Sequence, residues 1–252
     1  MATIDTSKEV VRSDLLVTRT AAWMADWSTF VDEPDYQDPE VAVADGYSNI
    51  PLPPGALSVA ALAIDALPLD DVRAGRVQRV WEGAQPVVVD TPLRSRITTG
   101  YGTVTTRFET LDGRTVATER ISVVDAPLND GAPDGPTAFG TGPIDLTRVR
   151  ALSWSLGEID PDRKWSWGQE PEVVRALGQR LIAPALVAGR TVVSGRDAPR
   201  RIIALTVRTT AAAAAMGSPL TAEVVGRDGS AVEVAVSADD RLLAAVSVRL
   251  RD

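Results

Sequence analysis

The sequence contains neither histidine nor cysteine. These absences exclude Ser-His-Asp and Cys-His catalysis, thiolate nucleophiles, disulfide bonds, and metal sites built on imidazole or thiolate ligands. Any general acid or base must therefore be Asp, Glu, Tyr, Lys or an ordered water. No cluster of other metal ligands is visible in the sequence, so we expect neither a metal ion nor another cofactor.

Strong positive charge and long apolar runs are also missing. The 252 residues carry a net charge of −8 and form no basic stripe, so we expect no nucleic-acid partner. No apolar run reaches the roughly 18 residues of a membrane span, so we expect no membrane partner. Residues 1–16 mix acidic and basic side chains without an apolar segment, which predicts no signal peptide and a cytoplasmic location. The 44% of hydrophobic residues is typical of a globular protein with a sizeable core.

One segment of the chain occurs twice. Residues 37–50 read QDPEVAVADGYSNI and residues 169–182 read QEPEVVRALGQRLI, and seven of these fourteen positions are identical at an offset of 132. The later parts of the two copies align at an offset of 127, through 91–93 with 218–220 and 112–114 with 239–241. A long period that occurs only twice indicates a duplicated domain. We therefore predict two similar halves, 1–125 and 146–252, joined by a linker at 126–145 that is rich in Pro and Gly.

Helices are expected early in each half. Residues 15–30 predict an amphipathic helix whose three aromatic residues recur at helical spacing, and we expect these rings in the core. Asp38 and Pro39 fit the N-cap and first position of a second helix, which ends at Gly46. The nearly apolar, Ala-rich segment 56–67 predicts a helix that is buried on most sides.

Alternation of apolar and polar residues follows, and it predicts antiparallel strands. These strands are expected near 76–82, 94–99, 103–110 and 115–124, and again near 202–208, 220–226, 231–236 and 242–250. In the second half, helical segments are expected at 171–177 and 182–193, and the alanine run 211–215 is interpreted as a tightly packed strand. An apolar helix wrapped by an antiparallel sheet, twice in one chain, resembles a tandem double hotdog of the α+β class.

The residues from position 32 onward make the resemblance more specific. The chain reads Asp32-Glu33-Pro34-Asp35-Tyr36-Gln37, then Asp38-Pro39-Glu40-Val41-Ala42, then Gly46, then Pro53-Pro54-Gly55-Ala56-Leu57. This order is similar to the MaoC-like family of R-specific enoyl-CoA hydratases and dehydratases. Their pattern is Asp-x-Asn-Pro-hydrophobic-His, then Asp-Pro-Glu-x-Ala, Gly, and a Pro-rich segment that opens the central helix. The resemblance implies water addition to, or removal from, an acyl thioester.

The chain departs from this family at the residues that act in its chemistry. Asp32 matches the family's Asp, but Gln37 occupies the position of the family's His. In the second half, Lys164 and Gln169 occupy the corresponding two positions. A glutamine amide does not titrate near neutral pH, so the family's mechanism cannot operate unchanged in either half.

Two groups of candidate site residues follow from this comparison. The candidate catalytic residues are Asp32, Asp35, Tyr36 and Gln37, and the candidate substrate-binding residues are Trp81, Trp165, Trp167 and Gln169. The acids can alternatively be interpreted as solvated loop residues and a helix cap. The tryptophans can alternatively be interpreted as core residues. The two glutamines fit a hydrogen bond at the start of each helix, or amides that polarise a substrate carbonyl. A pocket between the halves is expected near 32–37 and the tryptophans of the second half.

Three functions are compatible with these residues. The first is an atypical, His-less dehydratase- or cyclase-like enzyme that acts on an acyl-thioester or polyketide-type intermediate, with an expected role in secondary metabolism. The second is a catalytically inactive hotdog subunit that binds acyl chains or stabilises an active homologue. The third is a hotdog thioesterase, which the Pro-Pro-Gly segment fits less well. The partner is a small or carrier-bound acyl substrate, and the chain is expected to be a monomer or a homodimer.

Overall fold

A single antiparallel sheet of ten strands forms the framework of the protein. The computed structural model describes residues 8–29, 34–58, 66–129, 137–158, 172–193, 202–214 and 217–251. The two expected sheets form one continuous sheet, because the two halves join edge to edge through β2 (Val77–Gly83) and β7 (Ile202–Thr209). The join runs from Gln78 opposite Arg208 to Glu82 opposite Ala204, so backbone hydrogen bonds continue from one half into the other.

Eight of the ten strands lie close to the predicted ranges. The ten strands are β1 (Lys8–Leu16), β2 (Val77–Gly83), β3 (Pro92–Gly100), β4 (Thr103–Thr110), β5 (Thr115–Val123), β6 (Phe139–Pro143), β7 (Ile202–Thr209), β8 (Pro219–Asp228), β9 (Ala231–Ala238) and β10 (Arg241–Leu250). The helices are α1 (Arg19–Ser28), η1 (Pro34–Tyr36), α2 (Pro39–Ala44), α3 (Leu69–Arg73), α4 (Leu146–Glu158), α5 (Glu172–Leu177), the π-helical turn η4 (Gly178–Ile182) and α6 (Ala183–Val193).

The order of the strands shows the internal repeat. Across the sheet the order is β1-β3-β4-β5-β2-β7-β10-β9-β8-β6. Reading outward from the β2–β7 join gives β5, β4, β3 and β1 on one side, and β10, β9, β8 and β6 on the other. Each half therefore contributes one strand before its helices and four after them, in the same spatial order.

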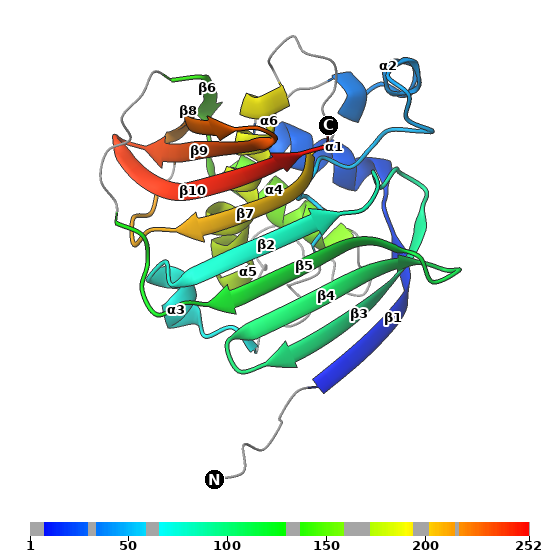
Figure 1. Ribbon diagram of the computed structural model, residues 1–252, viewed down its shortest axis with the longest axis horizontal. Helices are drawn as coiled ribbons and strands as arrows, with labels where there is room; N and C mark the ends of the chain where they lie inside the picture. The colour runs from blue at the N-terminus through cyan, green and yellow to red at the C-terminus, as the bar shows by residue number, and fades with distance from the viewer. Residues whose placement is uncertain are drawn as a thin grey trace.

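Helices cover one face of this sheet. Figure 1 shows the sheet as the near layer with α1, α4, α5 and α6 behind it. In the second half, α6 packs on β6 to β10 and is the central helix, with Ala185, Leu186, Val187 and Ala188 buried. The predicted central helix of the first half, 56–67, lies largely outside the described residues, which stop at Ser58 and resume at Ala66.

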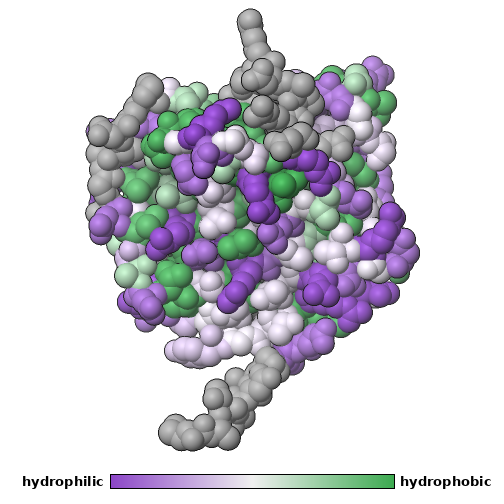
Figure 2. Space-filling model, viewed as in Figure 1, coloured by the Kyte–Doolittle hydropathy of each residue, from purple (hydrophilic) through white to green (hydrophobic). Residues whose placement is uncertain are grey.

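Strands alternate between a buried and an accessible side, as a sheet covered on one face requires. In β2, Val77, Arg79 and Trp81 face the covered side, while Gln78 and Val80 are half-buried. Figure 2 shows purple and green side chains interspersed over the face turned toward the viewer. In the part of the chain that the structure describes, every helix is too short or too polar to cross a membrane.

Three sequence predictions about local structure are corrected. Residues 15 and 16, predicted as the start of a helix, belong to the edge strand β1, and the helix begins at Arg19. The end of the predicted linker forms β6, which pairs with β8. The alanine run is irregular from 211 to 214, because it follows the end of β7 and extends no ladder.

The aromatic face of α1 is also not in the core. Trp23 is 44% exposed, and its ring stacks on that of Trp27 with 5.8 Å between centroids. The guanidinium carbon of Arg148 in α4 lies 4.2 Å from the centre of the Trp27 ring. The buried face of α1 consists instead of small residues and one acid, namely Ala21, Ala22, Ala25, Asp26 and Ser28. Small side chains let α1 and α4 approach closely, so the tryptophans cover the edge of this contact.

Candidate functional site

A pocket of about 870 Å³, its open mouth included, lies where the first half meets the beginning of β7 and the C-terminal end of the chain. We call it the first pocket. It is lined by Asp35, Tyr36, Tyr47, Pro51, Leu52, Pro53, Pro54, Leu57, Trp81, Gly83, Ala84, Gln85, Pro86, Val87, Ile202, Ile203 and Arg251. Most of these residues are apolar, and the few polar groups are an acid, two phenols, an amide and one arginine. Such a lining suits an extended apolar molecule with a polar group at one end.

Two extended segments build one wall of the first pocket. The amide of Leu52 donates to the carbonyl of Val87 at 2.8 Å, and the amide of Val89 donates to the carbonyl of Ile50 at 2.9 Å. The prolines between 51 and 54 stiffen this wall, because each fixes its own φ angle. Gly55 then turns the chain with a φ of +81°, and a Cβ there would lie 2.6 Å from Leu205 Cδ1. The turn therefore requires glycine.

The short helix η1 brings two candidate catalytic residues to the first pocket. Asp35 and Tyr36 both line it, and both are half-buried. The carbonyl of Pro34 accepts hydrogen bonds from the amides of Gln37 at 3.0 Å and Asp38 at 2.8 Å, which closes the η1 turn. The carboxylate of Asp38 then accepts from the amide of Glu40 at 2.8 Å, which confirms the predicted N-cap of α2.

Gln37 does not line the first pocket. Its side-chain amide donates to Asp26 Oδ2 at 2.7 Å, and Asp26 is fully buried on α1. Arg19 adds a second link, since its Nη2 donates to the Gln37 carbonyl at 3.1 Å. The Gln37 side chain thus connects α1 to the end of η1. Asp26 was missed in the sequence, although it lies one helical turn from Ala22 on a face of small residues.

Trp81 on β2 forms the floor of the first pocket. Its side chain is only 6% exposed, and its Nε1 has no hydrogen-bond acceptor among the residues that the structure describes. Gly83, two residues along the strand, leaves room for the indole, because a Cβ at Gly83 would lie 2.5 Å from Trp81 Cη2. The sequence proposed Trp81 for substrate binding, and the structure places it in the lining.

A buried ion pair lies beneath the same wall. Arg79 Nε donates to Glu119 Oε1 at 2.7 Å, and the two side chains are 0% and 1% exposed. The hydroxyl of Ser58 donates to Glu119 Oε2 at 2.8 Å, and Arg79 Nη2 donates to the carbonyl of Gly55 at 2.6 Å. These bonds fix the 55–58 segment, which carries the pocket residue Leu57, to β2 and β5. The period-two pattern placed Arg79 on the same face as Val77, but its burial went unrecognised.

Other predicted site residues lie outside the described residues. These are Asp32, Trp165, Trp167 and Gln169. The expected meeting of 32–37 with the tryptophans of the second half therefore stays a prediction. Within the ranges that the structure describes, no group of three or more Asp and Glu side chains is arranged to hold a metal ion.

The fold and pocket define an α+β protein with the double-hotdog architecture of MaoC-like dehydratases. Compared by sequence, the chain matches no protein-family model and no curated protein.

Two solved MaoC-like dehydratases share the fold over nearly the whole chain. One is 17% identical, with a TM-score of 0.61, and the alignment covers 96% of this chain and 98% of that protein. The other, from Phytophthora capsici, is 11% identical, with a TM-score of 0.57 and coverage of 98% and 96%. The peroxisomal multifunctional enzyme type 2 of Drosophila melanogaster is 11% identical, with a TM-score of 0.61, and the match covers 97% of this chain and 48% of that enzyme.

Proposed function

We propose that the chain is a His-less dehydratase- or cyclase-like enzyme that acts on an acyl-thioester or polyketide-type intermediate in the first pocket. The observation that carries this proposal is the shared location of Asp35, Tyr36 and Trp81. An acid, a phenol and a buried indole thus share the lining of a mostly apolar pocket. The fold shared with MaoC-like dehydratases supports the reaction class.

Dehydration requires one base and one acid. In our proposal the carboxylate of Asp35 removes the proton from the carbon next to the thioester carbonyl. That electron pair forms the new double bond as the bond from the β-carbon to its hydroxyl breaks. Tyr36 donates a proton to the departing hydroxyl, which leaves as water, and Asp35 returns its proton to Tyr36 through solvent. Both groups are available without histidine.

Cyclisation needs fewer reacting groups in the same pocket. A polyene or enone held against Trp81 and the proline-rich wall has its reacting carbons aligned, and such positioning contributes much of the rate. Asp35 and Tyr36 then supply the proton transfers.

A binding role without catalysis is favoured by one observation. Gln37, which the resemblance places at the position of the family's His, is bonded to Asp26 and is not part of the pocket lining. A chain without the family's complete Asp-His pair that kept the pocket would bind acyl groups or stabilise an active homologue.

Mass spectrometry of a panel of 3-hydroxyacyl and enoyl thioesters and unsaturated polyketide mimics distinguishes these functions. Wild type is compared with Asp35→Asn, Tyr36→Phe and Asp32→Asn. The matched control is Asp38→Asn, because asparagine also caps a helix and Asp38 lies outside the pocket lining.

Dehydratase chemistry is supported if the substrate mass changes by one water molecule, and if Asp35→Asn or Tyr36→Phe abolishes this change while Asp38→Asn preserves it. An unchanged mass with altered retention supports cyclisation or isomerisation. Free thiol in the product mixture favours a thioesterase. Thioester binding with no conversion of any substrate favours the binding role and overturns catalysis.

A further inference from the structure

A second pocket of about 560 Å³, its open mouth included, lies in the second half of the chain. It is lined by Ile144, Val149, Gln179, Arg180, Ala183, Ala212, Ala213, Ala214, Ser218, Leu220 and Leu243. Arg180 is the only charged residue of this lining. The alanine run, which forms no strand, thus forms one wall of a cavity.

The two pockets occupy equivalent places in the internal repeat. At the offset of 132, Tyr47 and Pro51 of the first pocket correspond to Gln179 and Ala183 of the second. At the offset of 127, the residues 85–87 correspond to 212–214. Both offsets are those of the sequence repeat. The two halves therefore each carry a pocket at this place, and the second has smaller side chains and an arginine but no acid in its lining.

Arg180 makes three described hydrogen bonds, all to backbone carbonyls. Its Nη1 donates to the carbonyls of Thr210 and Ala212, each at 3.1 Å, and its Nη2 donates to the carbonyl of Arg73 at 2.6 Å. A guanidinium has five N–H donors. Two donors of Arg180 therefore remain for a ligand, and none of its described partners carries a negative charge.

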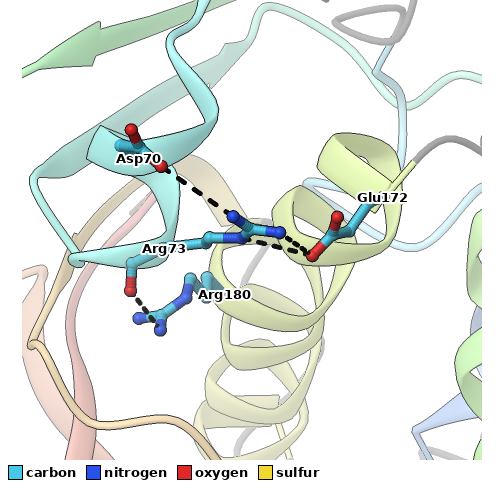
Figure 3. Close-up of polar contacts among 4 residues, drawn as sticks. All are labelled: Asp70, Arg73, Glu172 and Arg180. Atoms are coloured by element: carbon cyan, nitrogen blue, oxygen red, sulfur yellow. Dashed lines mark hydrogen bonds and ion pairs between the residues drawn. The ribbon is translucent and has the colours of Figure 1, made fainter.

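The acidic residues near Arg180 form ion pairs with another cation, Arg73. Figure 3 shows Asp70 and Glu172 both directed at Arg73, while Arg180 donates to the Arg73 backbone carbonyl and to neither acid drawn there. Arg73 Nε donates to Glu172 Oε1 at 3.2 Å. Arg180 is half-buried, and burial lowers the pKa of its guanidinium. A partly desolvated cation without a counterion is stabilised when an anion reaches it.

We propose that the second pocket binds a monocarboxylate with an apolar body, whose carboxylate contacts the two free N–H donors of Arg180. Carboxylates match the planar fork of arginine. The apolar chain then packs against the alanine wall, Leu220 and Leu243. This site is separate from the proposed reaction in the first pocket, and it gives the repeat's second copy a function of its own.

Nuclear magnetic resonance titration with octanoate labelled with ¹³C at its carboxyl carbon tests this site, with 1-octanol as the uncharged probe. We expect octanoate to bind the wild type at least about tenfold more tightly than octanol. Arg180→Gln should weaken octanoate about tenfold and leave octanol within about twofold. Arg180→Lys, which keeps the charge, should recover part of the affinity.

Two bulky substitutions at equivalent positions of the repeat separate the pockets. Ala213→Trp fills the second pocket without altering Arg180, and Pro86→Trp fills the first; both residues are exposed. We expect Ala213→Trp to abolish octanoate binding and to preserve conversion of thioesters. Pro86→Trp should preserve octanoate binding and abolish conversion of thioesters.

Three outcomes would overturn the proposal. These are equal affinity for octanoate and octanol, octanoate affinity unchanged in folded Arg180→Gln, and octanoate binding lost in Pro86→Trp but kept in Ala213→Trp. None of them depends on whether the first pocket catalyses a reaction.

Discussion

The side-chain amide of Gln37 donates a 2.7 Å hydrogen bond to the buried carboxylate of Asp26. This bond joins α1 to the end of η1, the helix that carries Asp35 and Tyr36. The contact therefore holds two pocket residues in place through their immediate neighbour. It also explains why an amide suits this position, since an amide donates to a carboxylate without adding charge to a buried site.

Gln37→Glu should be destabilising, because it places a second carboxylate against Asp26. We expect a loss of about 2–4 kcal/mol in unfolding free energy at neutral pH, measured by urea denaturation. The deficit relative to wild type should shrink at low pH, where one of the two carboxyls holds a proton. Adding Asp26→Asn restores one amide and one carboxylate, and should recover most of the stability. If the double variant is no better than Gln37→Glu, the hydrogen bond is not the reason for the loss.

The buried pair of Arg79 and Glu119 predicts a large cost for removing one partner. Glu119→Gln leaves a buried guanidinium without its carboxylate, and we expect a loss of about 3–5 kcal/mol. The control is the exposed pair formed by Arg249 Nη2 of β10 and Glu82 Oε1 of β2 at 3.3 Å, where Glu82→Gln should cost at most about 1 kcal/mol. Similar costs at both sites, measured by urea denaturation, would contradict the predicted effect of burial.

The close approach of Gly83 to Trp81 predicts a coupled pair of substitutions. Gly83→Ala places a methyl group against the indole, and we expect a loss of about 1–3 kcal/mol from overpacking. In a Trp81→Leu background the indole is absent, so the same Gly83→Ala change should cost much less. A double-mutant cycle by thermal and urea unfolding measures this difference. Additive losses would show that the two side chains do not compete for space.

The sequence predicted the strands that are covered on one face and paired along both edges. In these strands, the alternation of apolar and polar residues reflects burial directly. The edge strands β1 and β6 were missed for a physical reason. Val10 and Val11 are neighbours in β1, and both are exposed, so the strand lacks a clean alternation. β6 is five residues long and contains two glycines and a proline, which are typical of turns.

Part of the lining of the first pocket was named from the sequence. Asp35, Tyr36 and Trp81 were named from the sequence, and all three line the first pocket. The buried charges Asp26 and Glu119 were not named from the sequence, because burial of a charge depends on partners far along the chain. Glu119 is 40 residues from Arg79, and no local signal links them.

The ion pair between α3 and α5 predicts a pH-dependent coupling. The hydrogen bond from Arg73 lowers the pKa of Glu172 below its ordinary value of 4.5. A carboxyl with a lower pKa in the folded state contributes stability above its unfolded pKa, and loses it as the pH falls through the folded pKa. We therefore expect the coupling free energy from Arg73→Gln, Glu172→Gln and the double variant to be constant between about pH 5 and 7. It should fall toward zero in more acidic solution, and high salt should weaken it at neutral pH because both side chains are exposed. A coupling that persists after Glu172 is protonated would mean that packing, and not charge, holds the two helices together.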